Sequence, residues 1–175
     1  MISDQQIADL RDCFSYDPET GAVSRIKSAA PNAKLGPITT ITPAGYLSLI
    51  LKRVNYSVHR VAWLLSFGMW PAGEIDHING VKTDNRLSNL REATRSQNEW
   101  NSPMRKANTS GYKGVGATKG GRWQARIKQF DKYTYLGTFD TAEEAHQAYC
   151  AEAKKRFGQY ANDGHFPLQQ REKCS

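Results

Sequence analysis

The sequence predicts an α+β protein made of small modules, and three observations support this prediction. Its 175 residues suffice for one medium domain or two small ones. Strand-like and helix-length segments alternate along the chain, and Pro and Gly breaks divide them into two or three modules. The stretch SPMRKANTSG has few core-forming residues, so an extended basic linker is expected at residues 102–110.

The first half of the chain combines one N-terminal helix with β-rich, basic sequence. Apolar residues at helical spacing predict the helix: Ile7, Leu10 and Phe14. A DPETG turn follows it, and GYLSLILKRVNYSVH predicts a hairpin that turns at about Arg53 to Asn55. Residues 59–70 have the length and composition of a helix, which Pro71 is expected to end.

An asparagine-rich segment, EIDHINGVKTDNRLSNLREATRSQN, covers residues 74–98. Asp76 and His77 stand at the end of a short, apolar-edged strand, and Asn89 opens a returning strand. The capping-box pattern TRSQ then predicts a helix that carries Asn98. These elements would surround one small polar site. Other polar residues of the loop are assigned to its turns: Asn79, Asp84 and Asn85.

A carboxylate, amide oxygens and an imidazole in one site suggest metal-assisted chemistry. Oxygens of Asp and Asn are hard ligands suited to Mg²⁺ or Mn²⁺, with other positions left to water and phosphate. His77 can take a proton from water near neutral pH. Metal-assisted hydrolysis of a phosphodiester uses such metal-binding oxygens together with a base. The cysteines lie far apart in the sequence, so no structural zinc is expected: Cys13, Cys150 and Cys174.

The same segment resembles the HNH nuclease motif, in the phage and intron homing-endonuclease form in which Asn replaces the last His. DHINGxxxDNRxxNLR followed by xxTxxxN fits this form, and with VHRVAW upstream the resemblance covers residues 45–101. It implies a ββα-metal nuclease core at residues 59–101, with residues 1–58 as a β-rich part of the same module.

The HNH resemblance also implies a role for each polar residue. Asp76 and Asn98 would bind a single divalent metal, His77 would be the general base, and Asn89 would fix the orientation of His77. His59 opens an apolar helix, where packing or capping is the common role. A phosphate contact by His59, and another by Arg105 in the linker, is the alternative.

Residues 111–162 predict a second module, a three-stranded antiparallel sheet packed on one helix. KGVGATKG, RWQARIKQF and KYTYLGTF are strand-like, and the middle one alternates apolar with polar or basic residues. The capping box TAEE opens a helix that is expected to end at Gly158. A C-terminal tail, residues 163–175, follows.

Positive charge is concentrated around the linker and this sheet. The net charge is +7, and one stretch holds eight cations against the single acid Asp131: Arg105, Lys106, Lys113, Lys119, Arg122, Arg126, Lys128 and Lys132. A solvated basic face is the simple explanation. Aromatic residues interleaved with the cations favour a nucleic acid as partner, because stacking and phosphate neutralisation often occur together in nucleic-acid binding.

GYKGV, RWQARI, YLGTFDTAEEAHQAY and GQYAN resemble the Apetala-type (AP2/ERF-like) DNA-binding domain. The resemblance implies that the partner is double-stranded DNA and that the sheet reads its major groove. The residues at or near its contact positions, with the linker lysine, are Lys106, Lys113, Arg122, Arg126, Lys128, Tyr133 and Tyr135. Gly116, Tyr133 and Tyr135 depart from the residues that plant domains carry there, so the plant target sequence does not transfer.

Together these patterns predict a site-directed DNA endonuclease that nicks one strand each time it binds DNA. It is expected to act as a monomer, with a dimer as the alternative. A non-catalytic DNA-binding regulator is the second hypothesis, and a non-specific toxin or packaging nuclease fits less well. No apolar run reaches the roughly 18 residues of a membrane span, and the charged N-terminus does not resemble a signal peptide. A cytoplasmic location, in a prokaryotic or phage-infected cell, is therefore expected.

Overall fold

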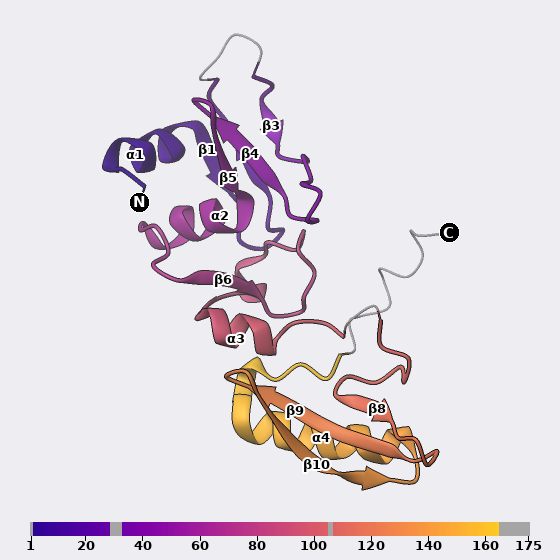
Figure 1. Ribbon diagram of the computed structural model, residues 1–175. Helices are drawn as coiled ribbons and strands as arrows, with labels where there is room; N and C mark the ends of the chain where they lie inside the picture. The colour runs from indigo at the N-terminus through magenta and orange to yellow at the C-terminus, as the bar shows by residue number, and fades with distance from the viewer. Residues whose placement is uncertain (1, 29–32, 105–106, 165–175) are drawn as a thin grey trace. The chain divides into compact units, whose positions relative to one another are not determined.

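The computed structural model describes residues 2–28, 33–104 and 107–164 (Figure 1). The chain divides into two compact units, Met1–Ala93 and Thr94–Ser175. Within the described ranges, no helix is both long and apolar enough to cross a membrane. The fold is mixed α and β with small antiparallel sheets, as the sequence predicts.

The first unit contains two α-helices, seven short strands and one 3₁₀ turn among its described residues. In chain order they are α1 (Asp4–Cys13), β1 (Phe14–Tyr16), β2 (Val23–Arg25), β3 (Gly36–Pro37), β4 (Ser48–Leu51), β5 (Val54–Ser57), α2 (Val58–Phe67), β6 (Glu74–His77), η1 (Leu87–Asn89) and β7 (Leu90–Ala93). Three antiparallel sheets result, with strand orders β1-β2-β3, β4-β5 and β6-β7.

Local sequence explains where these elements begin and end, with two corrections. The β4–β5 hairpin turns at Lys52 and Arg53, both with positive φ, slightly earlier than predicted. Helix α2 ends at Gly68, which adopts the left-handed conformation and donates its N–H to the Leu64 carbonyl. The predicted stop at Pro71 was therefore wrong, because a glycine C-cap ends the helix earlier.

One apolar core holds the first unit together and reaches the β6–β7 hairpin. Phe14, Val58 and Leu64 are at most 2% exposed. Ile75 of β6 and Leu90 of β7 belong to the same buried cluster. Because side chains alternate along a strand, the core contact of Ile75 fixes the direction in which Asp76 points. The hairpin that carries the candidate site is therefore anchored by burial.

The second unit has the predicted sheet and helix. Its elements are α3 (Arg95–Trp100), β8 (Val115–Ala117), β9 (Trp123–Gln129), β10 (Lys132–Phe139), α4 (Ala142–Phe157) and η2 (Gly158–Tyr160). The antiparallel order is β10-β9-β8, and α4 packs on the sheet. Ala125 and Ile127 of β9 are buried, while Arg126 and Lys128 between and beyond them are exposed. This alternation confirms the predicted two-faced strand.

Helix α3 packs within the second unit, although its sequence belongs to the segment that resembles HNH nucleases. The Trp100 ring stacks on Phe157, with centroids 4.5 Å apart and an interplanar angle of 14°. Trp100 also meets the Phe130 ring edge-on at 5.9 Å. The Asn162 amide donates to the Asn101 side-chain oxygen over 3.2 Å. The boundary of the two units thus follows β7, whereas the sequence grouped residues 59–101 together.

Candidate functional site

The β6–β7 hairpin places Asp76 and His77 side by side at the end of β6. Asp76 pairs with Arg91 across the hairpin, and His77 pairs with Leu90. Only 4% of Asp76 and 5% of His77 is exposed. The Arg91 side chain donates from Nε (2.9 Å) and Nη2 (2.7 Å) to the Asp76 carboxylate. This ion pair compensates the buried negative charge, and sequence reasoning did not assign Arg91 a role.

One ring nitrogen of His77 contacts an asparagine of the loop. Its Nε2 lies 3.0 Å from the side-chain oxygen of Asn85. An amide oxygen can only accept a hydrogen bond, so this contact requires the proton on Nε2 and leaves the lone pair of the neutral ring on Nδ1. Burial lowers the pKa of His77 below its usual value, against the opposing effects of Asn85 and Asp76. A neutral imidazole near pH 7 is the form that a general base needs.

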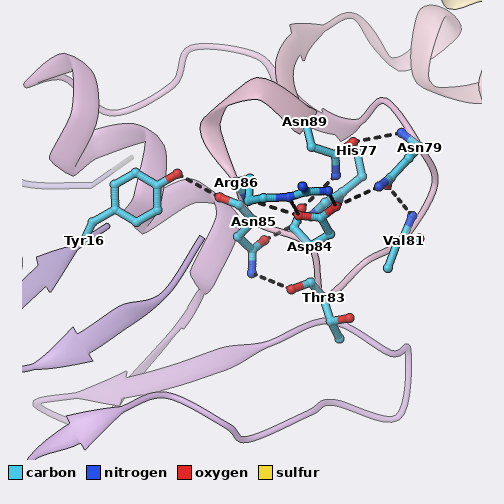
Figure 2. A network of polar contacts seen from close by, with 9 residues as sticks. All are labelled: Tyr16, His77, Asn79, Val81, Thr83, Asp84, Asn85, Arg86 and Asn89. Carbon is cyan, nitrogen blue, oxygen red and sulfur yellow. Dashed lines mark hydrogen bonds and ion pairs between the residues drawn. The ribbon is translucent and has the colours of Figure 1, made fainter. Parts of the chain in front are cut away.

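The predicted orienting residue, Asn89, makes different contacts. Its side-chain oxygen accepts from the Asn79 backbone N–H (2.9 Å), and its amide nitrogen donates to the Asp84 carbonyl (2.8 Å). Asn89 therefore closes the loop, and Asn85 makes the contact with His77 (Figure 2). Asn85 is 1% exposed, yet the sequence shows it only as one of several turn-forming asparagines.

The remaining turn residues act as predicted. Asn79 donates to the Asp84 carboxylate over 2.8 Å and accepts from the Val81 N–H. Arg86 forms an ion pair with Asp84 at 2.6 Å. The hydrogen bonds from Arg86, the largest cause, and from Asn79 lower the pKa of Asp84 to about 2, against the opposing effect of burial. The loop between β6 and β7 is thus fixed by its own polar side chains.

His59 of α2 lies against His77 in a cluster of three rings. The two imidazoles meet edge-on with centroids 5.1 Å apart, and the Tyr46 ring lies 5.3 Å from His59. Nδ1 of His59 is buried without a hydrogen-bond partner among the described residues. Burial lowers the pKa of His59 to about 3, so the ring is uncharged at neutral pH. His59 therefore packs against His77 as an uncharged ring, and its phosphate contact remains a prediction. Arg105 lies outside the described residues.

Stability is expected to fall as the pH drops below 6.5, because His59 binds a proton only after unfolding. Its pKa is about 3 in the folded protein and 6.5 as the ordinary value. Between these values His59 is protonated only in the unfolded chain. The contribution of His59 to the free energy of unfolding is therefore fully present above pH 6.5 and is lost progressively towards pH 3. At pH 5 this loss amounts to about 2 kcal/mol.

Chemical denaturation at pH 7.5 and pH 5 measures this loss. The matched variant is His59→Phe, which keeps a planar ring and removes only nitrogen atoms that titrate. Between pH 7.5 and pH 5, its free energy of unfolding is expected to fall by about 2 kcal/mol less than that of the wild type. Equal pH dependence in the two proteins would contradict the assignment.

The second unit presents cations and aromatic rings on one sheet face. Tyr133 and Tyr135 of β10 are 64% and 59% exposed, and they stand opposite Lys128 and Arg126 of β9. Arg122 pairs with Asp140 at 2.8 Å just before β9. A groove of about 1120 Å³ runs along this face and is lined by residues that include Arg126, Lys128 and Tyr133. These groups suit a polyanion with stacking bases.

Lys113, a predicted DNA contact, is engaged with backbone atoms, and Asn98 lies on α3. The Lys113 Nζ donates to the backbone carbonyls of Trp100 (3.0 Å) and Ser102 (2.7 Å), and burial lowers its pKa to about 8. Lys113 thus binds the chain after α3 through its ammonium group, and its DNA contact remains a prediction. Lys106 lies outside the described residues. Asn98 belongs to the second unit, and Asp76 to the first.

Comparison with known proteins supports the nuclease interpretation of this segment. Residues 56–100 match the HNH endonuclease family. The chain is 42% identical over 62 residues to Protein 3.8 of Escherichia phage T7, a match that covers 35% of this chain and 51% of that protein. The chain thus spans about half the length of the curated relative it matches. The match at residues 56–100 supports the assignment of this segment to a nuclease domain.

Proposed function

We propose that this protein is a site-directed DNA endonuclease of the homing-endonuclease type, which hydrolyses one phosphodiester bond per engagement. One observation carries the proposal: within the segment that matches HNH endonucleases, a buried neutral histidine adjoins a buried carboxylate, and its Nε2 is engaged by Asn85. In the Nε2-protonated form, the lone pair that would accept a proton from an attacking water lies on Nδ1 of His77. Proton transfer by a positioned base is the step that such a site supplies.

The donor set suits a divalent metal. Asp76 would hold Mg²⁺ or Mn²⁺ through a carboxylate oxygen, and Asn98 through its amide oxygen, as the HNH resemblance implies. A metal held there would supply charge stabilisation at the scissile phosphate and the leaving 3′ oxygen. Arg91 holds the Asp76 carboxylate in place through two N–H donors, and His77 removes the proton from water in line with the leaving group. The products would be a 5′ phosphate and a 3′ hydroxyl.

The basic sheet is proposed to recognise the DNA target, in the manner of Apetala-type domains. Arg126, Lys128, Tyr133 and Tyr135 share one exposed face, where they can contact phosphates and base edges. A monomer with one such site is expected to nick DNA. The alternative is a regulator that binds DNA through the same face and does not cut. The buried Asp76–His77 pair favours the enzyme, because a scaffold has no need of it.

Cleavage is expected to require a divalent metal. Purified protein incubated with supercoiled phage or plasmid DNA should yield open-circular product with Mg²⁺ or Mn²⁺. Excess EDTA should abolish this product, and added metal should restore it. Asp76→Asn, which keeps the size of the side chain, should lower the nicking rate by at least about a hundredfold. Tight binding of DNA without cleavage under all metal conditions would instead favour the regulator.

A further inference from the structure

The turn of the β1–β2 hairpin lies against the loop that holds His77. The Leu87 backbone N–H donates to the Pro18 carbonyl over 3.1 Å. Gly21 has φ +75°, and a Cβ built on it would lie 2.4 Å from the Arg86 backbone nitrogen and 2.6 Å from the Asn85 carbonyl carbon. Only glycine allows so close an approach of two backbones. Segments far apart in the sequence thus meet directly behind Asn85.

Tyr16, at the end of β1, completes this contact. Its hydroxyl donates to the backbone carbonyl of Asn85 over 2.8 Å, across 69 residues of sequence (Figure 2). Burial is the main cause that raises the pKa of Tyr16 to about 12, so the hydroxyl keeps its proton under all conditions of interest. The phenol therefore remains a donor, as a carbonyl acceptor requires.

The hairpin turn is itself fixed before it meets the loop. The Asp17 carboxylate accepts from the Glu19 N–H (3.0 Å) and from the Thr20 hydroxyl (2.7 Å). The Gly21 N–H donates to the Asp17 carbonyl over 2.9 Å. A turn closed in this way presents the Pro18 carbonyl and the bare Gly21 Cα as a rigid surface. It can therefore hold the opposing backbone in place.

We infer that residues 16–21 form a positioning device for the proposed general base. Tyr16 and the turn fix the backbone of Asn85. The Asn85 side-chain oxygen then holds the His77 ring through Nε2 and favours the form protonated there. The inference rests on the proposed function, and it makes Tyr16 a positioning residue. The N-terminal hairpin thereby becomes part of the nuclease, beyond its contribution to the core.

Tyr16→Phe tests this inference, because it removes only the hydroxyl that reaches Asn85. The nicking rate constant under saturating DNA is expected to fall about tenfold, with the DNA concentration at half-maximal rate unchanged. Tyr56→Phe is the matched control: its hydroxyl accepts from Gln6 at 3.1 Å in the same unit, away from the loop. It is expected to nick at the wild-type rate.

A second readout separates positioning from a loss of stability. Nitrogen-15 NMR of the imidazole rings reports which nitrogen of His77 carries the proton. Tyr16→Phe should lower the fraction protonated on Nε2, and Tyr56→Phe should not. A wild-type rate and tautomer in Tyr16→Phe, beside an inactive His77→Ala, would overturn the inference alone. An active His77→Ala would overturn the proposed function itself.

Discussion

His77→Ala is expected to lower the rate of DNA nicking by about 10² to 10⁴, the usual contribution of a positioned general base. DNA affinity should stay within about twofold, because His77 is 5% exposed and the proposed DNA-binding face belongs to the other unit. Single-turnover nicking of supercoiled DNA measures the rate, and a gel-shift titration without metal measures the affinity.

The control for His77→Ala addresses the cavity that the substitution leaves. Asn85 loses its partner and the ring cluster loses a member, so the free energy of unfolding should fall by roughly 1–3 kcal/mol. His146→Ala removes another buried histidine, 9% exposed and located in the second unit. It should destabilise that unit and yet leave the rate of nicking by bound, folded protein unchanged. Comparable rates for His77→Ala and wild type would contradict the catalytic assignment.

Gly114→Ala is expected to destabilise the second unit by roughly 3 kcal/mol or more. Gly114 has φ +77°, and an added Cβ would lie 2.1 Å from Cδ2 of Tyr149, a buried ring of the core. The methyl group has no space, because the clash is with a ring fixed by α4. Unfolding of this unit would remove the basic face, so DNA affinity should fall together with the stability.

Gly121→Ala provides a matched control for Gly114→Ala. Gly121 has the same φ of +77°, but no atom lies within 4 Å of an added Cβ. This substitution should therefore cost only the strain of a left-handed backbone, about 1 kcal/mol. Chemical denaturation followed by circular dichroism measures the loss of stability in each variant. Equal effects of the two substitutions would contradict the role of the clash.

Most of the local structure follows from short-range sequence signals. The capping boxes at Thr94 and Thr141 start α3 and α4 as predicted. The alternation along RWQARIK gives a strand with one buried and one basic face. Asp76 and His77 end a strand that returns through Leu90, again as predicted. Such signals depend on neighbours within a few residues, so the sequence itself displays them.

The tertiary structure decided which polar residues meet. The sequence contains several asparagines in one loop, and only packing shows that Asn85 contacts His77 while Asn89 closes the loop. Tyr16 reaches this loop from 69 residues away. The Lys113 ammonium group donates to the backbone carbonyls of Trp100 and Ser102, which no local pattern shows. Contacts of this kind depend on the three-dimensional path of the chain, which no local pattern encodes. The sequence determined the chemical groups and the elements that carry them; long-range burial determined their partners, because a buried polar group must find a partner wherever the fold provides one.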